Sequence, residues 1–357
     1  MHLRARAHVD PAAIAANAHT LRAAIARGTR LCAVVKADGY GHGARLAARA
    51  ARPDWLAVAT ALEAADLRAA GFARPRILVM GALSPAEREI ALAARADLVA
   101  WEPGFLDGLP ADARVHVKLD TGMGRLGTRS PEQATALAEA LAAGGRLAGL
   151  MTHFATADVA DDPFFDEQLA RFTAWAGPLR ERLGAVLLHA ANSAATFRDP
   201  AAHFDMVRAG VALYGLDPAN SDPARLGLRP ALRLSSYVAA VKRCAEGESA
   251  GYGRRFVAPR DTVLATVPIG YGDGWRRGLS DNAEVVIGGT RYPLVGTVSM
   301  DNVTVDLGPG AVSIEPGDEV TLIGDGITAE QVAGRLRTLN YEVTCGLTAR
   351  VSRTVAG

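Results

Sequence analysis

Lysine is rare in this chain, and two of its three lysines directly follow apolar runs. The sequence has 39 basic residues, of which only Lys36, Lys118 and Lys242 are lysine. Arginine stays protonated at any ordinary pH, whereas lysine can lose its proton and act as a nucleophile or base. Lys36 in AVVKADGYGHG and Lys118 in VHVKLD are therefore candidates for chemistry that a guanidinium cannot perform, while Lys242 is interpreted as a solvated surface charge.

The segment around Lys36, together with two later segments, contains residue types that could bind a cofactor. A lysine that loses its water at the end of a strand has a lowered pKa and can form a Schiff base. The glycine-rich segment after it gives backbone freedom, and Tyr40 within that segment could donate a hydroxyl to a phosphate. Asn192 with Ser193, at the start of a helical stretch, and the turn at residues 208–211 could donate to the same anion. A Schiff-base lysine with several phosphate donors indicates pyridoxal phosphate.

Further polar side chains follow other apolar runs, at the point where each run ends. They are Lys118 with Asp120 and Arg125, His153, Asn192 with Ser193, and Arg208. In a closed barrel of parallel strands, the carboxyl ends of all strands meet at one mouth, where the catalytic residues lie. We therefore expect these side chains to share one site with Lys36.

The elements that would hold this site form a regular alternation. Eight short apolar runs alternate with alanine-rich amphipathic segments, at residues 31–37, 55–60, 76–81, 97–103, 114–120, 147–155, 185–193 and 205–216. The pattern predicts an α/β fold with a (β/α)8 TIM-type barrel, and an open doubly wound sheet is the alternative.

The amino-acid composition changes near residue 230, after which valine, threonine and glycine are the dominant residues. We place the barrel in residues 1–231 and a mostly β domain in residues 232–357. Within that domain we expect one helix after Thr328, because Gln331 follows it at the spacing of a capping box.

Composition narrows the class of protein further. Apolar residues make up 49% of the chain and charged residues 22%, which is typical of a globular enzyme. The net charge of +1 gives no reason to expect a nucleic acid or a membrane surface as partner. Three scattered cysteines do not form a disulfide framework, and the N-terminus lacks the apolar core of a signal peptide. We expect a cytoplasmic enzyme without a metal site.

Gly122, Gly124 and Gly127 spell the dinucleotide-binding pattern GxGxxG by letter. That pattern requires a helix to begin inside the motif, because the helix N-terminus binds the pyrophosphate. Here Pro131 places the helix start later, so a dinucleotide site is the weaker interpretation.

Taken in order, these segments resemble the alanine racemase family over almost the whole chain. The similar stretches are AVVKADGYGHG, VKLDTGMGRLG, THFA, NSAA and DMVRAGVALYGL, followed by AGYG, VPIGYGDGW, SMD and NYEVTC. The resemblance implies a bacterial fold-type III pyridoxal phosphate isomerase that interconverts L-alanine and D-alanine and supplies D-alanine for peptidoglycan.

The resemblance also implies roles for individual residues. Lys36 would hold the cofactor and act as a base on D-alanine, and Tyr252 would be the base for L-alanine, with its pKa lowered by positive charge near His153. The other cofactor-binding positions would be Tyr40, Arg125, His153, Asn192, Ser193, Arg208 at the pyridine nitrogen, Gly210, Val211 and Tyr341. The substrate-binding positions would be Arg125, Met300, Tyr271 and Asp301.

Two further implications concern a modification and a partner. Lys118 would be carboxylated to N6-carboxylysine and hold Arg125, and a plain ion pair between Lys118 and Asp120 is the alternative. Tyr252, Met300 and Asp301 lie in the second domain and would reach the barrel of another subunit, which implies a head-to-tail homodimer.

One position departs from the family's pattern, and three other functions are alternatives to an alanine racemase. Thr297 stands where many members have arginine, which puts the breadth of substrates in doubt but leaves the reaction class unchanged. A broad-specificity racemase is the nearest rival, although Tyr271 and Tyr341 at the entrance favour a small side chain. A decarboxylase would have an acidic residue in place of Arg208. A non-catalytic barrel that only binds pyridoxal phosphate would lack the domain that carries Tyr252.

Overall fold

The computed structural model describes residues 4–310 and 313–355, and these form two compact units. The barrel unit comprises residues 14–40 and 44–213. The β unit comprises residues 41–43 and the described parts of residues 1–13 and 214–357.

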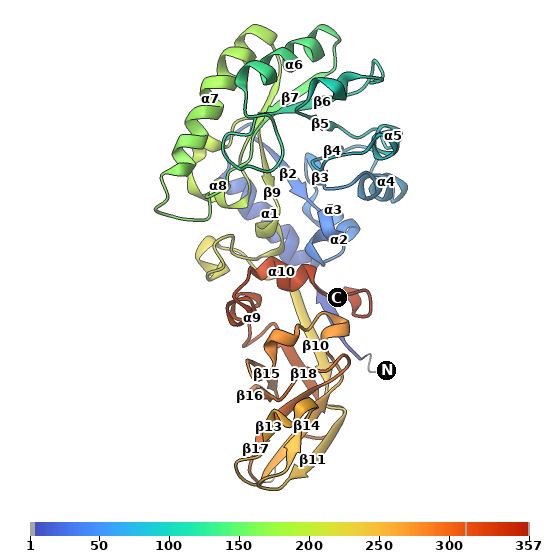
Figure 1. The fold of residues 1–357 in the computed structure, drawn as a ribbon, viewed down its shortest axis with the longest axis vertical. Coiled ribbons are helices and arrows are strands. Elements are labelled where there is room, and N and C mark those ends of the chain that lie inside the picture. Colours follow the sequence, from blue (N-terminus) through green and yellow to red (C-terminus); the bar gives the residue numbers. More distant parts are fainter. Residues whose placement is uncertain (1–3, 311–312, 356–357) are drawn as a thin grey trace. The chain divides into compact units, whose positions relative to one another are not determined.

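The barrel unit contains eight parallel strands (Figure 1). They are β2 (Arg30–Val34), β3 (Trp55–Val58), β4 (Arg76–Val79), β5 (Leu98–Ala100), β6 (Val115–Lys118), β7 (Leu147–Met151), β8 (Leu187–His189) and β9 (Met206–Ala209). The strands pair in the orders β4-β3-β2-β9 and β5-β6-β7-β8. A parallel bridge between Leu78 and Asp97 joins β4 to β5, and a hydrogen bond of 2.9 Å from Arg208 N to Ala191 O joins β9 to the end of β8. The expected closed barrel is confirmed, and the open sheet is excluded.

Helices connect most of these strands and surround them (Figure 1). They are α1 (Pro11–Ala24), α2 (Lys36–Tyr40), α3 (Ala44–Ala51), α4 (Ala61–Ala69), α5 (Pro85–Ala93), α6 (Pro131–Ala143), α7 (Phe164–Leu183) and α8 (Ser193–Arg198). The connection from β5 to β6 contains the 3₁₀ turn Pro103–Leu106 in place of an α-helix. Apolar side chains from most of the strands fill the interior, among them Trp55, Leu78, Val99, Met151 and Met206. Because the interior is packed with apolar side chains, polar side chains lie at the strand ends, or inside only where they are hydrogen-bonded.

The β unit is built on a sheet in the order β11-β14-β17-β16-β15-β18-β10-β1-β19. Its strands are β1 (Arg6–Val9), β10 (Leu232–Tyr237), β11 (Ala240–Cys244), β14 (Thr262–Val267), β15 (Ala283–Ile287), β16 (Thr290–Val295), β17 (Val303–Gly308), β18 (Glu319–Ile323) and β19 (Ser352–Val355). A hairpin of β12 (Ser249–Ala250) and β13 (Phe256–Val257) is separate. Buried and half-buried residues alternate along β15 and β17, as expected when one face of a sheet is covered.

The N-terminal strand differs from its expected place. The sequence assigned the first residues to the barrel, but β1 pairs antiparallel with β10 and parallel with β19 in the β unit. Ala7 and Val9 of β1 are fully buried there. The pairing joins the first and last strands of the chain, and no local pattern in the sequence reveals such a contact.

The α-helices that lie wholly within the described residues of the β unit are α9 (Ala329–Leu336) and α10 (Asn340–Cys345). The expected capping box is confirmed at the start of α9: Thr328 Oγ1 accepts a hydrogen bond from Gln331 N at 3.2 Å, and Gln331 Oε1 accepts one from Thr328 N at 3.3 Å. The short helix α10 was not expected from the sequence.

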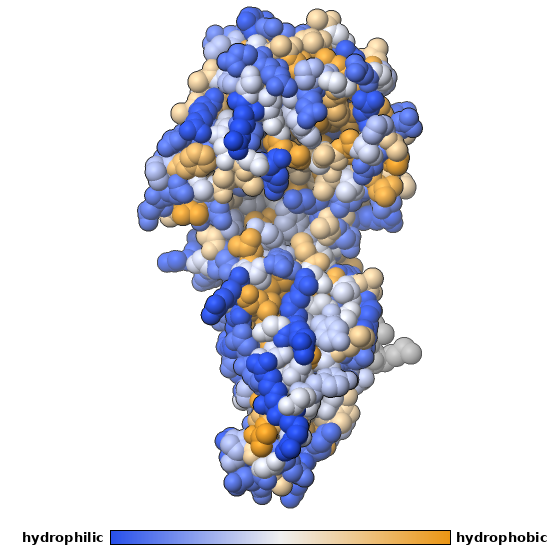
Figure 2. Space-filling model, in the orientation of Figure 1, coloured by the Kyte–Doolittle hydropathy of each residue, from blue (hydrophilic) through white to orange (hydrophobic). Residues whose placement is uncertain are grey.

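The face of the molecule in Figure 2 carries hydrophilic residues around smaller hydrophobic groups. Among the described residues, no helix is both long enough and apolar enough to cross a membrane.

The capping box of α4 gives a test of how the barrel helices are held. Thr60 Oγ1 accepts a hydrogen bond from Glu63 N at 3.2 Å, and Glu63 Oε2 accepts one from Thr60 N at 3.1 Å. We expect Thr60→Ala to lower the free energy of unfolding by about 1 kcal/mol, because an amide at the helix start loses its acceptor. Urea unfolding measures this change. Thr60→Ser is the control and should keep most of the stability, and equal losses in both variants would contradict the account.

Candidate active site

Lys36 begins a backbone turn of unusual conformation. Residues 37–40 all have positive φ, at 52°, 49°, 62° and 54°. A left-handed conformation costs roughly 1–2 kcal/mol for each residue other than glycine, so the surroundings must hold this turn in place. Glu63 Oε1 accepts a hydrogen bond from Ala37 N at 2.6 Å, and Asp38 Oδ1 accepts one from Ala44 N at 2.9 Å. Strain of this kind is concentrated at functional sites in proteins.

Three of the expected phosphate-binding residues lie together near this turn. Ser193 Oγ accepts hydrogen bonds from Gly210 N at 3.0 Å and from Ala212 N at 3.3 Å. A Cβ atom on Gly210 would lie 2.4 Å from the hydroxyl oxygen of Tyr40, so any larger residue there would force the Tyr40 side chain to move. The Nζ atom of Lys36 lies 5.9 Å from the ring centroid of Tyr40. The lysine, the hydroxyls and the backbone amides therefore gather at one end of the barrel, as the sequence predicts.

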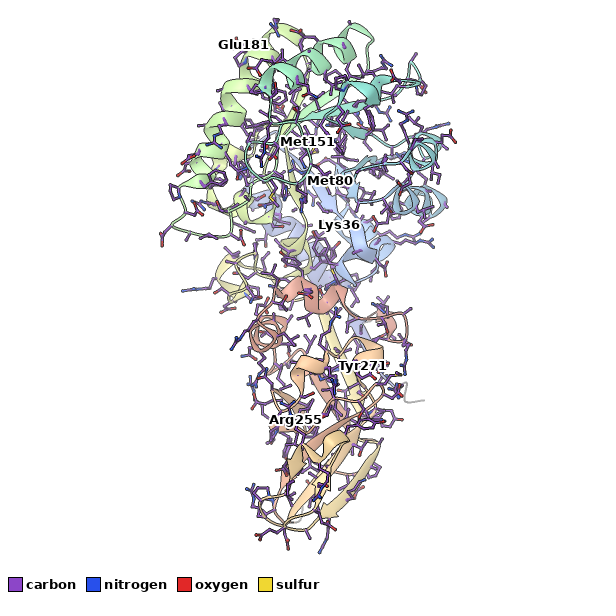
Figure 3. The ribbon with its side chains drawn as sticks, viewed as in Figure 1. Lys36, Met80, Met151, Glu181, Arg255 and Tyr271 are labelled. Carbon is purple, nitrogen blue, oxygen red and sulfur yellow. The ribbon has the colours of Figure 1, made fainter. Side chains whose placement is uncertain are left out.

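The remaining expected residues of this group follow from the same strand ends. Asn192 is the N-cap of α8, and its Oδ1 accepts a hydrogen bond from Ala195 N at 2.9 Å. Val211 directly follows Gly210 and begins a 3₁₀ turn. Lys36, at the start of α2, is labelled in Figure 3, together with Met151 at the end of β7 and Met80 just after β4. Tyr341 lies in α10 of the β unit, so its contact with a phosphate stays a prediction.

Arg208 is buried in β9, with 3% of its surface exposed, and its Nη1 and Nη2 atoms are hydrogen-bonded to neutral groups. Its two Nη2–H groups donate to Thr152 O at 2.8 Å and to Ala190 O at 2.9 Å, and one of them is shared with His153 Nδ1 at 3.2 Å. Its Nη1 atom donates to His189 Nδ1 at 2.8 Å. Burial lowers the pKa of Arg208 to about 10, which still leaves it charged at neutral pH. The site therefore contains a positive charge that can donate but cannot accept a proton.

Both histidines beside Arg208 are neutral. Burial, followed by the charge of Arg208, lowers the pKa of His153 and of His189 well below the ordinary value. Because His153 accepts from Arg208 through Nδ1, its proton is on Nε2. His153 can therefore donate one hydrogen bond toward a further group.

Lys118 is also buried, with 4% of its surface exposed. Burial and the positive charges of Arg208 and Arg125 lower its pKa to about 8. In the described part of the chain, the ion pair of Asp120 is made with Arg129, at 3.5 Å, and no carboxylate forms an ion pair with Lys118. The alternative of a Lys118–Asp120 ion pair is therefore wrong for this structure.

The glycine-rich loop after Lys118 is a tight loop and not the start of a helix. Both oxygens of Asp120 accept from Gly124 N at 3.0 Å, and Oδ1 also accepts from Gly122 N at 3.0 Å. The helix α6 begins only at Pro131, with Ser130 as its N-cap. The dinucleotide interpretation requires a helix inside the motif and is therefore excluded.

The other expected residues are in the β unit and are exposed. Tyr252 has 72% of its surface exposed, Tyr271 42% and Met300 52%. Tyr271 N donates to Ser299 O at 3.1 Å, and Gly272 N donates to Met300 O at 2.9 Å, which holds Tyr271 beside Met300. Thr297 Oγ1 donates to Tyr252 O at 3.1 Å. Tyr271 is labelled in Figure 3. That Tyr252, Tyr271 and Met300 form one active site with Lys36 stays a prediction.

Sequence reasoning missed the residues that hold Asp301. Arg350 Nη2 forms an ion pair with Asp301 Oδ1 at 2.7 Å, and its Nε lies 3.3 Å from Asp273 Oδ1. Asp273 has a fully buried side chain and also pairs with Arg4 at 3.0 Å. Asp273 follows Tyr271 by two residues, so the acidic residue within GYGDG could have indicated an ion-pair cluster at this position.

Family models match both parts of the chain. The model described as "Alanine racemase, N-terminal domain" matches residues 9–218, and "Alanine racemase, C-terminal domain" matches residues 231–355. A curated alanine racemase of Mycobacterium tuberculosis is 42% identical over 375 residues, covering 99% of this chain and 96% of the relative. One from Desulfovibrio desulfuricans is 40% identical over 365 residues, covering 97% and 96%.

Solved structures are similar over the full chain. The alanine racemase from D-cycloserine producing Streptomyces lavendulae has a TM-score of 0.93 at 36% identity, covering 100% of this chain and 98% of the other. That of Bacillus anthracis, with bound L-Ala-P, has a TM-score of 0.89 at 34% identity, covering 100% and 96%.

Gly210 gives a direct test of the grouping around Lys36. We expect Gly210→Ala to weaken binding of pyridoxal phosphate at least about tenfold, because the new methyl group displaces the Tyr40 hydroxyl. Absorbance titration of cofactor-free protein measures the affinity. Gly334→Ala is the matched control, because Gly334 is in helix α9 and a Cβ there meets no atom within 4 Å. Equal affinity in the two variants would contradict the proposed grouping.

Proposed function

The chain belongs to the alanine racemase family and interconverts the enantiomers of alanine, and from that premise we propose pyridoxal phosphate as its cofactor and Lys36 and Tyr252 as its two bases. The single observation that supports this best is the gathering of Lys36, Tyr40, Ser193 and Gly210 at one end of the barrel. We propose that the product D-alanine is supplied for peptidoglycan.

The barrel residues fit pyridoxal phosphate in their chemistry. The Tyr40 hydroxyl lies against Gly210, and the Gly210 amide donates to the Ser193 hydroxyl, so hydroxyl and amide donors are close together. Arg125 and Arg208 would supply positive charge to the site of an anionic cofactor and substrate. Lys36 would hold the cofactor covalently, and the residues that would hold its phosphate and ring are Tyr40, Asn192, Ser193, Gly210, Val211 and Tyr341, with Arg208 at the pyridine nitrogen. When bound, the cofactor withdraws electrons and makes the α-proton of the amino acid acidic.

Arg208 decides how far that electron withdrawal goes. A guanidinium can donate a hydrogen bond to the pyridine nitrogen but cannot give up its proton at neutral pH, because the pKa of Arg208 stays near 10. With Arg208 there, the nitrogen would stay unprotonated, and the cofactor would withdraw electrons from Cα less than with a carboxylate partner. Rapid return of a proton to Cα is favoured, which suits an enzyme that only moves a proton. A decarboxylase with an acidic residue at this position is disfavoured for the same reason.

Racemisation requires a base on each face of Cα. Lys36 would remove the α-proton of D-alanine, and Tyr252 of a second copy would remove that of L-alanine. An ordinary tyrosine has a pKa of about 10, so its anion needs stabilisation. His153 carries its proton on Nε2, and we propose that this N–H donates to the oxygen of Tyr252 while Arg208 supplies the nearby positive charge.

A second copy of the chain would complete the site. Tyr252, Tyr271 and Met300 are among the most exposed large apolar side chains among the described residues of the β unit. Apolar side chains that gather on a surface commonly mark an interface. We propose a head-to-tail homodimer in which Tyr252, Tyr271, Met300 and Asp301 face the barrel of the partner, with Met300 and Asp301 near the substrate carboxylate.

We propose that Lys118 is carboxylated by carbon dioxide. Only an unprotonated amine forms a carbamate, and a pKa near 8 leaves roughly a tenth of the amines unprotonated at pH 7. The modification replaces a buried positive charge beside Arg125 and Arg208 by a negative one. It would remove the repulsion by the two arginines, which adds to burial in lowering the pKa of Lys118, and would hold Arg125 toward the substrate carboxylate.

A broad-specificity racemase of the same fold is the second candidate. Thr297 supports it, because its hydroxyl is bonded to Tyr252 O and its side chain is shorter than the arginine of many family members. Initial rates with L-alanine, L-serine and L-lysine distinguish the two, and comparable rates for all three would favour the broad enzyme.

The two bases are tested by exchange of the α-proton in deuterated water. We expect Lys36→Ala to lose the visible absorbance of the bound cofactor. Tyr252→Phe should keep that absorbance but lose exchange from L-alanine by roughly 10²–10⁴-fold, with a much smaller loss from D-alanine. Proton NMR measures both rates. Tyr292→Phe in β16 is the control and should exchange both isomers normally, and a Tyr252→Phe protein that does the same would refute the tyrosine as a base.

The carbamate is tested by ¹³C NMR of the enzyme under ¹³CO₂. Because burial lowers the pKa of Lys118 to about 8, the reactive neutral amine dominates above that pH and is depleted below it. We therefore expect a carbamate signal that decreases as the pH falls from 9 to 6. Lys118→Arg should lack the signal and lose activity, because arginine cannot form the carbamate. Full activity of the native enzyme in carbon dioxide-free buffer, with no signal, would contradict the modification.

A further inference from the structure

A continuous series of buried polar side chains crosses the barrel interior and ends at Arg208. Asp97 precedes β5, His116 is in β6, and His189 ends β8. His116 Nε2 lies 3.1 Å from Asp97 Oδ2, His116 Nδ1 lies 2.8 Å from His189 Nε2, and His189 Nδ1 lies 2.8 Å from Arg208 Nη1. The residues Asp97, His116 and His189 have no exposed surface. None of these three was assigned a role from the sequence.

The direction of every hydrogen bond in this series follows from one fact, that arginine only donates. Since Arg208 donates to His189 Nδ1, the proton of neutral His189 must be on Nε2. That proton is donated to His116 Nδ1, so the proton of His116 must also be on Nε2. It is donated in turn to Asp97 Oδ2. A series that begins at a donor must end at an acceptor, and the carboxylate of Asp97 is that acceptor.

The surroundings of Asp97 keep it ionised and in place. Arg114 Nε donates to Asp97 Oδ1 at 3.1 Å, and Arg76 forms an ion pair with Oδ2. The guanidinium of Arg76 lies 4.2 Å from the ring centroid of Trp55, and the ring of Trp55 meets that of His116 edge-on at 5.6 Å. Two half-exposed arginines and one tryptophan therefore fix the acceptor and the first histidine of the series.

We propose that Asp97 and His116 are positioning residues for racemisation, which act through His189 to fix the direction and orientation of the Arg208 guanidinium. The inference rests on the proposed place of Arg208 at the pyridine nitrogen. A carboxylate in direct contact with Arg208 would orient it but would also neutralise it. Through two neutral imidazoles, Asp97 orients Arg208 without contact, so that the full positive charge faces the site.

His116 and Lys118 lie on the same strand. The two residues are separated by one position along β6, so their side chains lie on the same face of the strand. Both are buried. One short strand thus presents both the histidine that orients Arg208 and the lysine proposed to orient Arg125.

The first test uses the native holoenzyme labelled with ¹⁵N-histidine. Ring-nitrogen NMR should show His116 and His189 as neutral imidazoles protonated on Nε2. Single His→Asn variants assign the signals. A charged His189, or protonation of its Nδ1, would overturn the proposal without any need for an active variant.

The second test measures kcat and KM in both directions. We expect His116→Leu to lower kcat about 10–100-fold in both directions with KM changed less than about threefold, because Arg208 loses its fixed orientation. His116→Asn should recover part of this loss, since its Oδ1 can accept from His189 Nε2. His203→Asn is the matched control: His203 is an equally buried histidine, bonded to Thr196 O at 2.9 Å, away from this series. It should lower the melting temperature but keep kcat.

The outcomes separate this proposal from the proposed function. If Arg208→Gln leaves activity intact, the proposed place of Arg208 is wrong. If Arg208→Gln lowers kcat while folded His116→Leu and Asp97→Asn both retain it, the positioning role is wrong and that of Arg208 stands. If His116→Leu does not fold, His116→Asn and the ring-nitrogen spectrum of the native enzyme decide.

Discussion

A guanidinium buried in the barrel interior is the constraint on which the rest of the site depends. Arg208 is almost fully buried, and burial makes each of its unpaired donors costly. Its Nη1 and Nη2 atoms donate to two backbone carbonyls and two neutral histidines, and no carboxylate among the described residues forms an ion pair with it. The positive charge therefore remains, and together with burial, which is the larger cause, it lowers the pKa of His153, His189 and Lys118.

Around this charge, the barrel combines a stable framework with a strained turn. Parallel strands with apolar side chains supply the framework, and capped helices such as α4 hold it from outside. The left-handed turn after Lys36 depends on that framework, because Glu63 both caps α4 and binds the amide of Ala37. The position of the lysine is thus tied to the packing of a helix that has no part in the chemistry.

Much of the barrel could be predicted because its strands are short apolar runs with polar residues directly after them. Lys36, Lys118 and Arg208 were singled out in this way. The capping box of α9 was predicted from the spacing of Thr328 and Gln331, and the late start of α6 from Pro131. The pairing of β1 with β10 and β19 could not be predicted, since it joins residues far apart in the sequence. His116 was also missed, because a histidine inside an apolar strand looks like part of the core, and Asp97 lies at the start of its strand and not at the end.

We propose that Arg208 donates to the cofactor's pyridine nitrogen and leaves it unprotonated. The ¹⁵N chemical shift of pyridoxal phosphate labelled at that nitrogen, recorded in the holoenzyme, tests this most directly. We expect the shift of an unprotonated, hydrogen-bonded nitrogen in the native enzyme. A protonated nitrogen would show that another group supplies the proton, and would contradict the role assigned to Arg208.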